Sequence, residues 1–465
     1  MTGNEEMLKG FTDHSYGPWK KQKDWKSPVC VVKAEGVYLY DEDGKPYIDF
    51  SSQFMCSNLG HGNKAIIEAI HRQADELVYV APVFAHKSGE RATEALMSVM
   101  PEGMNKFFFS TSGSLANESA VQIIRQCMSP SHKIIARYHS YHGGTASGMT
   151  LTGGPRHRFA ERDRYGIEGV IFAPDAYCYR CPFGQKYPEC NIRCAEYVDH
   201  MIKEEGNVAA VFIEPVVGTN GKQVPPPEYL PRLRQICDEN GVLLVVDEVM
   251  SGWFRTGPAF AVDNWKVKPD ILTTAKGCTG SYTPVGITAT AGKVTDYYED
   301  NTIYFGFTYT MHPLMMAAIP PAISEYSKLC ASGILSRVSK YMQMRLYELQ
   351  ERHECIGDVR GIGHFWALEL VKNRKTKELF NVKADKFYKK LLADRLAAEA
   401  LKKGMFIMSW YDHLTVAPPL IITEEEVDEG IKILDEVLEI ADKEVEHTGV
   451  PGSRSSEEYI KSLPL

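Results

Sequence analysis

The chain of 465 residues lacks three features that would each point to a class of protein. No apolar run approaches the ~20 residues that a membrane-spanning helix needs. The formal net charge of -8 provides no basic field for nucleic acid. The first residues, MTGNEEMLKG, lack the cationic start and apolar stretch of a secretory signal peptide. We therefore expect a soluble, cytoplasmic protein that binds neither membrane nor nucleic acid.

The sequence also has no fixed-period repeat, and its 11 cysteines are spread along the chain apart from one cluster. That cluster contains Cys178, Cys181, Cys190 and Cys194. The spacing is compatible with a zinc or iron–sulfur site, with two disulfides, or with a loop insert packed by free thiols. Because no export signal accompanies the cysteines, a reduced compartment is favoured. We include no metal among the expected cofactors.

The composition is that of a globular protein, with 44% hydrophobic and 24% charged residues. A chain of this length can build more than one core. We expect residues 1–60 to form an N-terminal arm and hairpin that join a small domain. Residues 61–320 are expected to form a large domain, and residues 321–465 a smaller C-terminal domain.

Local patterns predict several elements. These are an irregular arm over residues 1–35, a hairpin over residues 36–50, a strand over residues 362–370, an amphipathic helix over residues 385–403 and a capping box at Thr423 and Glu426.

Two buried strands each lead into a residue that can do chemistry. The uninterrupted apolar run over residues 242–246 is typical of a strand buried on both faces, and Asp247 follows it. A second apolar segment, residues 271–275, leads into Lys276. Because ligands bind at the carboxyl ends of parallel strands, we expect Asp247 and Lys276 to face one crevice.

Pyridoxal phosphate chemistry needs such a pair. A lysine amine holds the aldehyde of the cofactor, and a carboxylate keeps the pyridine nitrogen protonated so that the ring accepts electrons. Taken singly, each residue also has a structural interpretation, as a helix cap or a solvated charge. The segment DEVMSGWFRTG before the strand that ends at Lys276 resembles the signature of the class III, or ω-amino acid, aminotransferases. The usual family form is DEVxxGFGRTG, from which Trp253 and Phe254 depart.

This resemblance implies an α/β protein of fold type I. Its central sheet would be mostly parallel with helices on both faces, and a smaller α+β domain would follow at the C-terminus. The large domain would bind pyridoxal phosphate.

A second motif follows a predicted strand at Phe107–Phe109. Ser112, Gly113 and Ser114 open a helix, and small residues at a helix N-terminus leave backbone N–H groups free for a phosphate. An ordinary helix cap is the alternative. The segment resembles the family's SGSEANE phosphate loop, with Leu115 where glutamate is common.

Further residues take their expected roles from the resemblance alone. Tyr141 and His142 match the family's Tyr-His-Gly, whose aromatic ring stacks on the pyridine. Glu214 matches the family's glutamate near the phenolate oxygen of the cofactor and the substrate. Val249 would pack on the opposite face of the ring.

The segment that contains Thr308 resembles the family's HGFTxxGHP. In that family the threonine reaches across a subunit interface to the phosphate of the neighbour. The resemblance therefore implies a homodimer with active sites at the interface, either alone or paired into a tetramer. A buried loop threonine is the other interpretation.

The family activity is transfer of an amino group to a 2-oxo acid in two half-reactions, with Lys276 moving the proton. Many members bind a substrate carboxylate with an arginine about ten residues before a Pro-Pro-Leu turn, where this chain has Met408. Arg156 and Arg158 are candidate replacements. Two guanidinium groups suit a sulfonate or a distant carboxylate, although surface arginines are common.

Trp19 and Phe54 are expected to supply aromatic walls for the substrate. Within the family the chain is most similar to taurine aminotransferases, which implies taurine as donor, 2-oxoglutarate as favoured acceptor and pyruvate second. A β-alanine, 4-aminobutyrate or diamine aminotransferase is the nearest alternative. A pyridoxal phosphate isomerase or decarboxylase, a cofactor-free lysine lyase and a metal-holding interaction protein are more remote.

Overall fold

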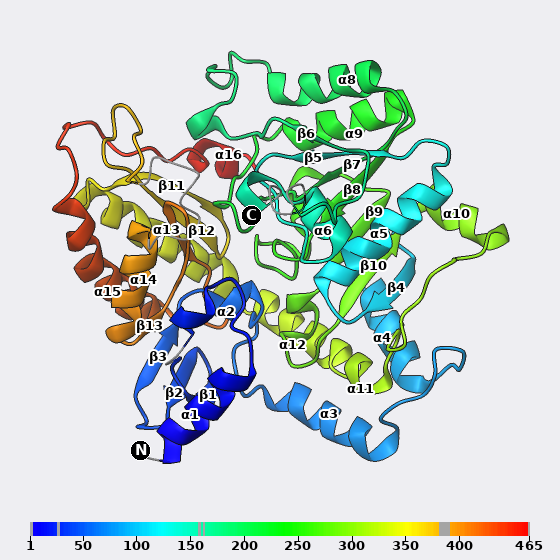
Figure 1. Cartoon of the computed structure of the whole chain (residues 1–465), viewed down its shortest axis with the longest axis horizontal. Helices are drawn as coiled ribbons and strands as arrows, with labels where there is room; N and C mark the ends of the chain where they lie inside the picture. The colour runs from blue at the N-terminus through cyan, green and yellow to red at the C-terminus, as the bar shows by residue number, and fades with distance from the viewer. Residues whose placement is uncertain (1–2, 26–27, 157–159, 161–162, 381–390, 464–465) are drawn as a thin grey trace.

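The computed structural model describes residues 3–25, 28–156, 160, 163–380 and 391–463. Its centre is a seven-stranded sheet in the order β4-β10-β9-β8-β7-β5-β6, in which only β10 runs against the other strands (Figure 1). The expected mostly parallel sheet is therefore confirmed. The strands are β4 (Lys106–Ser110), β5 (Lys133–Arg137), β6 (Val170–Ala173), β7 (Val208–Ile213), β8 (Leu243–Asp247), β9 (Ile271–Thr274) and β10 (Gly286–Thr290).

The apolar runs form strands because both faces of the sheet are covered. In β8, Leu243 and Val245 belong to a core cluster with Ile123 of helix α5 (Gly113–Cys127). The alternate residues, Leu244 and Val246, belong to the other cluster, on the side of helices α8 (Arg193–Glu205) and α9 (Tyr229–Asn240). The uninterrupted hydrophobicity of β8 thus follows from its two buried faces.

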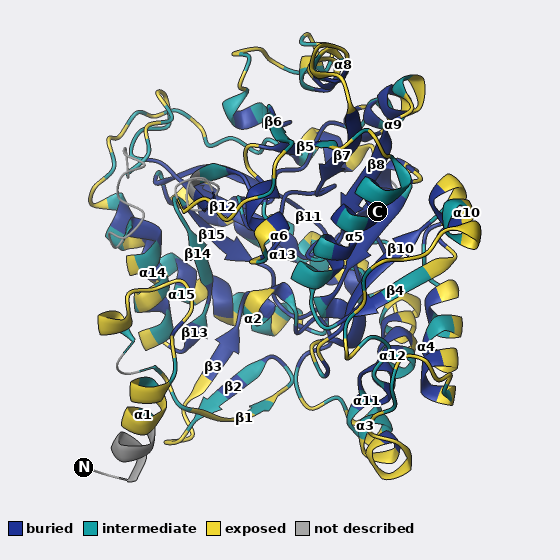
Figure 2. Ribbon diagram, turned by 45° about the vertical axis from the view of Figure 1, so that its right-hand side comes forward, coloured by how far each residue is buried: buried dark blue, intermediate teal, exposed yellow. Residues whose placement is uncertain are grey.

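Among the described residues, eleven further helices belong to the central sheet and the C-terminal part. They are α2 (Ser52–Met55), α3 (Lys64–Glu76), α4 (Lys87–Met97), α6 (Ala146–Leu151), α10 (Gly292–Asp300), α11 (Pro313–Met316), α12 (Ile319–Ala331), α13 (Ile334–Arg352), α14 (Leu392–Lys402), α15 (Glu424–Asp442) and α16 (Glu457–Lys461). Those at the periphery, such as α3, α4 and α10, have their exposed residues on the outer side (Figure 2). No helix in the described part of the chain combines the length and the apolar character that crossing a membrane requires.

The N-terminal region is more regular than the sequence suggested. The predicted hairpin is present as β2 (Tyr38–Asp41) and β3 (Pro46–Asp49). The prediction of an irregular arm over residues 1–35 is wrong, because this segment contains α1 (Gly3–His14) and β1 (Val31–Glu35). Strand β1 pairs with β2, and β3 pairs in parallel with β13 (Met405–Phe406) from near the end of the chain. This four-stranded sheet therefore joins both ends of the sequence.

The C-terminal part contains a sheet in the order β11-β12-β15-β14. The strand expected over residues 362–370 is present over Phe365–Leu370 as β12, but its predicted start is wrong, because Ile362 ends the preceding antiparallel strand β11 (Ile356–Ile362). Gly363, with φ 64°, makes the reversal possible between them. The other two strands are β14 (Met408–Trp410) and β15 (His413–Val416).

The two helix predictions in this part have different outcomes. The amphipathic helix is present as α14, which begins at Leu392. The prediction for residues 381–390 lies outside the described residues. The capping box is confirmed, because the Thr423 hydroxyl accepts from the Glu426 N–H while the Glu426 carboxylate accepts from the Thr423 N–H.

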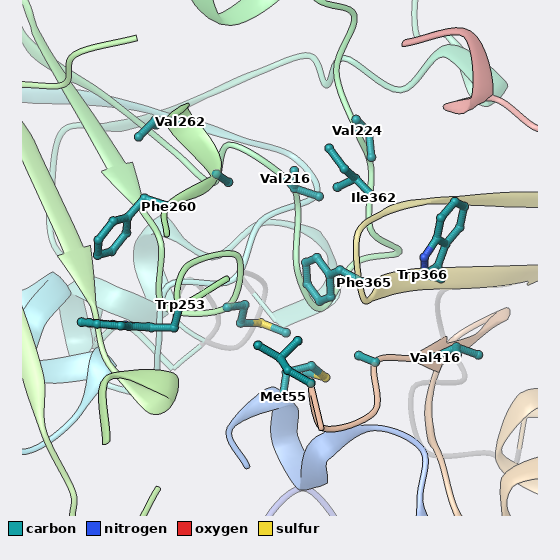
Figure 3. Close-up of a cluster of buried hydrophobic side chains, with 14 of the residues drawn as sticks. Met55, Val216, Val224, Trp253, Phe260, Val262, Ile362, Phe365, Trp366 and Val416 are labelled. Atoms are coloured by element: carbon teal, nitrogen blue, oxygen red, sulfur yellow. The ribbon is translucent and has the colours of Figure 1, made fainter. Parts of the chain in front are cut away.

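One apolar core connects the central sheet with the C-terminal sheet (Figure 3). It includes Met55 from the N-terminal region, Trp253 and Phe260 from the loop after β8, and Phe365 and Trp366 from β12. Trp253, one of the two departures from the family signature, is only 1% exposed and donates to the Thr274 hydroxyl at 2.8 Å. The unusual residue is thus a core residue with a satisfied N–H group.

The four clustered cysteines line one cavity of about 20 Å³ and are present as free thiols. Burial raises the pKa of Cys178 to about 11 and that of Cys194 to about 12. In the described part of the chain, no group of three or more His, Cys, Asp or Glu side chains is placed to hold a metal ion. Of the three alternatives left by the sequence, the geometry matches thiols that pack a loop.

Candidate active site

A cavity of about 870 Å³ opens at the carboxyl edge of the central sheet. Elements from both ends of the chain contribute to it. It is lined by all but two of the site residues expected from the sequence: Trp19, Phe54, Ser112, Gly113, Ser114, Tyr141, His142, Arg156, Glu214, Asp247, Val249 and Lys276.

Lys276 lies where β9 passes into a short 3-10 helix, with φ 48°. A positive φ is uncommon for a residue with a side chain, and such strain gathers at functional sites. Burial lowers the pKa of its amine. No described residue accepts a hydrogen bond from Nζ, so the amine is available to a bound group.

Asp247 ends β8 and is 3% exposed. Its Oδ2 atom accepts from His142 Nδ1 at 2.8 Å and from Asn117 Nδ2 at 2.7 Å. Its Oδ1 atom accepts from the Val249 N–H at 2.9 Å. These contacts keep the carboxylate in one orientation toward the cavity. The sequence interpretation missed Asn117, although it lies within the SGSLANE segment that resembles the phosphate loop.

The predicted phosphate loop caps α5. The Ser112 side chain accepts from the Leu115 N–H at 3.2 Å. A Cβ atom at Gly113 would lie 2.7 Å from Val249 Cγ1, so a larger residue would displace the apolar wall of the cavity. The turn therefore brings the positive N-terminus of a long helix to the cavity, as an anion site requires.

Glu214 follows β7 and is 3% exposed. Its carboxylate accepts from the Tyr141 N–H at 3.0 Å and from the Gly218 N–H at 2.7 Å. Burial raises its pKa. These contacts fix the backbone of Tyr141 beside the cavity.

Arg156 is the most unusual group in the cavity. Its guanidinium carbon lies 3.6 Å from the centre of the Trp410 ring, 4.5 Å from that of Tyr141 and 5.0 Å from that of Trp19. The residue is 6% exposed, and its Nε and Nη1 atoms have no hydrogen-bond partner among the described residues. Burial lowers its pKa to about 10. A buried cation with unused donors is suited to an anion.

The sequence interpretation missed Trp410, which β14 places in the cavity. Its ring N–H donates to Asn220 Oδ1 at 2.8 Å. The one available signal was its position two residues after Met408, where the family's carboxylate-binding arginine aligns.

Two expected residues lie elsewhere. Thr308 is exposed and does not line the cavity of its own chain, although its carbonyl accepts from the Tyr79 hydroxyl at 3.2 Å. Arg158 lies outside the described residues. Phe54 is at the rim, with 57% of its surface exposed.

The family model for class III aminotransferases matches residues 20–438. The chain is a class III aminotransferase. It is 32% identical over 449 residues to a putrescine–pyruvate aminotransferase of Pseudomonas aeruginosa, which covers 94% of each chain. It is 32% identical to a taurine–pyruvate aminotransferase of Bilophila wadsworthia, which covers 88% of this chain and 92% of that one.

Among solved structures, the fold is similar to that of a taurine:2-oxoglutarate aminotransferase from Bifidobacterium kashiwanohense in complex with PLP and glutamate. The TM-score is 0.88 at 32% identity, with 96% of this chain and 99% of that chain covered. The expected fold type I is therefore confirmed.

Class III aminotransferases use pyridoxal phosphate, so this is the cofactor of the chain. The cavity fits it. A helix N-terminus is present for the phosphate, a buried carboxylate at Asp247 for the ring nitrogen, and at Lys276 an amine without a described acceptor for the aldehyde.

Proposed function

We propose that this aminotransferase moves the amino group of taurine to a 2-oxo acid, with 2-oxoglutarate favoured and pyruvate second. The observation that carries the proposal is Arg156. Its guanidinium is buried among aromatic rings, and two of its nitrogens have no hydrogen-bond partner in the part of the chain that the structure describes. A sulfonate would supply charge and acceptors for these N–H groups, with charge-assisted hydrogen bonds stronger than neutral ones.

The same residue helps to rank the alternatives. A diamine such as putrescine would bring a second ammonium toward the guanidinium of Arg156, and like charges repel in a buried setting. β-Alanine and 4-aminobutyrate end in a carboxylate, which the same guanidinium can bind. These two donors are therefore the second candidate, and a panel of donors at equal concentration separates them from taurine.

Pyridoxal phosphate, when bound, supplies an electron-accepting ring that carries the amino group between the two half-reactions. We assign the surrounding roles to residues of this chain. The N–H groups of Ser112, Gly113 and Ser114 would hold the phosphate. Asp247 would accept the N–H of the ring nitrogen. Lys276, kept reactive by its lowered pKa, would act as general acid/base that removes the proton from the carbon of the donor in the first half-reaction and delivers a proton to the carbon of the oxo acid in the second.

The walls of the cavity orient these groups. Tyr141, whose backbone N–H donates to Glu214, and Val249 would cover the two faces of the ring. His142 keeps Asp247 in place through its hydrogen bond. Trp19 and Phe54 would supply aromatic walls at the entrance of the cavity, while Arg156 would hold the anionic end of the substrate.

We also propose that the enzyme is a homodimer with active sites at the interface. Several large apolar side chains are exposed near Thr308: Leu77, Val78, Tyr79, Val83, Phe84, Ile303, Tyr304 and Tyr309. Contiguous exposed apolar surface marks interfaces. In such a dimer, Thr308 would reach the phosphate of the partner. We likewise propose that the chain is divided into an N-terminal arm and hairpin (residues 1–60), a large cofactor-binding domain (residues 61–320) and a small C-terminal domain (residues 321–465).

The test of the donor is the near-visible absorption spectrum of the holoenzyme before and after taurine is added without any oxo acid. We expect the long-wavelength band of the lysine-bound cofactor to fall as the amino group is transferred. A band that ignores taurine but responds to β-alanine would replace the donor and keep the reaction class. No band after reconstitution with the cofactor would contradict the roles of Lys276 and Asp247.

Replacing Arg156 with alanine is expected to raise the apparent KM for taurine about 10–100-fold, as loss of hydrogen bonds to a charged group implies. The cofactor spectrum should stay unchanged, because the guanidinium is assigned to the substrate. Arg156→Lys keeps a charge without the planar fork and should recover part of the affinity. Unaltered taurine kinetics in Arg156→Ala would remove Arg156 from the substrate site.

A further inference from the structure

Three buried polar side chains, on β9, α5 and β8, are connected in series by hydrogen bonds that end at Asp247. The Thr273 hydroxyl donates to Asn117 Oδ1 at 2.5 Å. The Asn117 amide then donates to Asp247 Oδ2 at 2.7 Å and to the His142 carbonyl at 2.9 Å. Thr273 and Asp247 are also directly paired across β9 and β8. These hydrogen bonds therefore connect the neighbouring strands β9 and β8 through α5.

A threonine in a buried strand needs an explanation, because valine has the same shape and no hydroxyl to satisfy. Thr273 is 0% exposed, and its hydroxyl uses its proton on the Asn117 oxygen. A side-chain amide can be turned over with little change in shape, which exchanges its oxygen and nitrogen. Turned over, Asn117 would present oxygen to a carboxylate.

We propose that Thr273 is a positioning residue that acts through Asn117 on Asp247. Its hydroxyl bonds to the Asn117 oxygen and so helps to hold the amide with nitrogen facing Oδ2, the orientation that the His142 carbonyl also requires. Asp247 then receives N–H donors from Asn117, His142 and Val249, which fix the orientation of its carboxylate. This inference rests on the proposed role of Asp247 as the partner of the ring nitrogen of the cofactor.

The chain offers a matched control. Thr288 on β10 is also 0% exposed, and its hydroxyl donates to the Ala116 carbonyl at 2.8 Å, one residue before Asn117. It pairs with Thr273 across β10 and β9 and contacts the same helix, but among the described residues its side chain has no hydrogen bond to Asn117 or Asp247. Thr273→Val and Thr288→Val therefore each remove one buried hydroxyl that is bonded to α5, and only the first removes a contact with Asn117. Thr273→Ser keeps the hydroxyl and is the rescue variant.

Three quantities are measured for each variant: the dissociation constant of pyridoxal phosphate from the apoenzyme, kcat and KM for the amine donor, and the melting temperature of the apoenzyme. We expect Thr273→Val to weaken cofactor binding about tenfold and to lower kcat with KM unchanged. Thr273→Ser should bind as the wild type does. Thr288→Val should lower only the melting temperature.

Asp247→Asn separates this inference from the proposed function. If Thr273 acts through Asp247, adding Thr273→Val to Asp247→Asn should weaken cofactor binding no further. Equal effects of Thr273→Val and Thr288→Val on cofactor binding and kcat would overturn the inference alone. Unchanged cofactor binding and kcat in Asp247→Asn would instead overturn the proposed role of Asp247. Should the valine variant not fold, Thr273→Ala against Thr273→Ser makes the same comparison.

Discussion

Lys276 occupies surroundings that lysine does not favour. Its φ is 48°, and burial depresses the pKa of its amine. Both features cost folding free energy, which the rest of the structure offsets. Such costs are expected at a residue whose reactivity depends on a neutral amine.

We predict that Lys276→Met stabilises the apoenzyme by about 0.5–2 kcal/mol while it abolishes transamination. A lowered lysine pKa destabilises the folded state wherever the unfolded chain binds the proton more tightly. The gain should therefore be largest at neutral pH and shrink as the pH rises toward the ordinary lysine value of 10.5. Thermal denaturation of apo forms at several pH values measures it. A variant less stable than the wild type at neutral pH would contradict the prediction.

At this scale, the sequence predicted the groups whose chemistry is explicit in a local motif. Asp247 and Lys276 each follow an apolar run, so a rule about strand ends was enough to bring them together. Trp410 and Asn117 could not be found in this way. Their roles depend on contacts between elements distant in sequence, such as the 3.6 Å approach of Trp410 to Arg156.

Among the elements, α13 and α15 are joined by a buried ionic contact. His353, which caps the C-terminus of α13, bonds to Asp442 at 2.6 Å and to Asp435 at 2.8 Å, both on α15. Burial alone would lower the pKa of His353, but the two carboxylates raise it above its usual value. The contact therefore stabilises the protonated imidazole.

His353→Gln is expected to destabilise the protein by roughly 1–2 kcal/mol near pH 6. A raised histidine pKa gives stability that is complete below the unfolded value of 6.5 and is lost as the pH rises through the folded value. The difference from the wild type should narrow as the pH increases above 6.5. His447→Gln is the control, because its contact with Glu354 is on an exposed side chain. A difference independent of pH would exclude the ionic interpretation.

The elements that were predicted well are those whose pattern of apolar residues follows directly from which of their faces are buried. Strand β8 is apolar up to its last residue, Asp247, because both its faces are buried. The strand predicted from residue 362 begins only at Phe365, because the turn between β11 and β12 is only Gly363 and His364, with apolar residues on either side. Helix α1 was missed because its sequence is mostly polar.

At the scale of the whole molecule, the exposed apolar residues predict which substitution would dissociate the proposed dimer. Val83 is 85% exposed, and the Glu side chain placed there by Val83→Glu would be buried in the proposed interface. We expect dissociation to monomers and weaker binding of pyridoxal phosphate, because each monomer would lose the contact that we propose for Thr308 of its partner. Sedimentation and cofactor titration measure the two effects. Met344→Glu, at an exposed apolar residue of α13, should change neither. A dimeric Val83→Glu variant would place the interface elsewhere.

The pairing of β3 with β13 has a consequence for synthesis on the ribosome. Ile48 pairs with Met405, so β3 emerges long before its partner exists. At ~5–20 residues per second, translation needs tens of seconds to cover the interval. Throughout that time the nascent chain carries an unpaired strand edge, which can pair with the same edge of a neighbouring nascent chain on one messenger RNA. The unpaired edge of β3 is thus the part of this sheet that a chaperone would need to cover during synthesis.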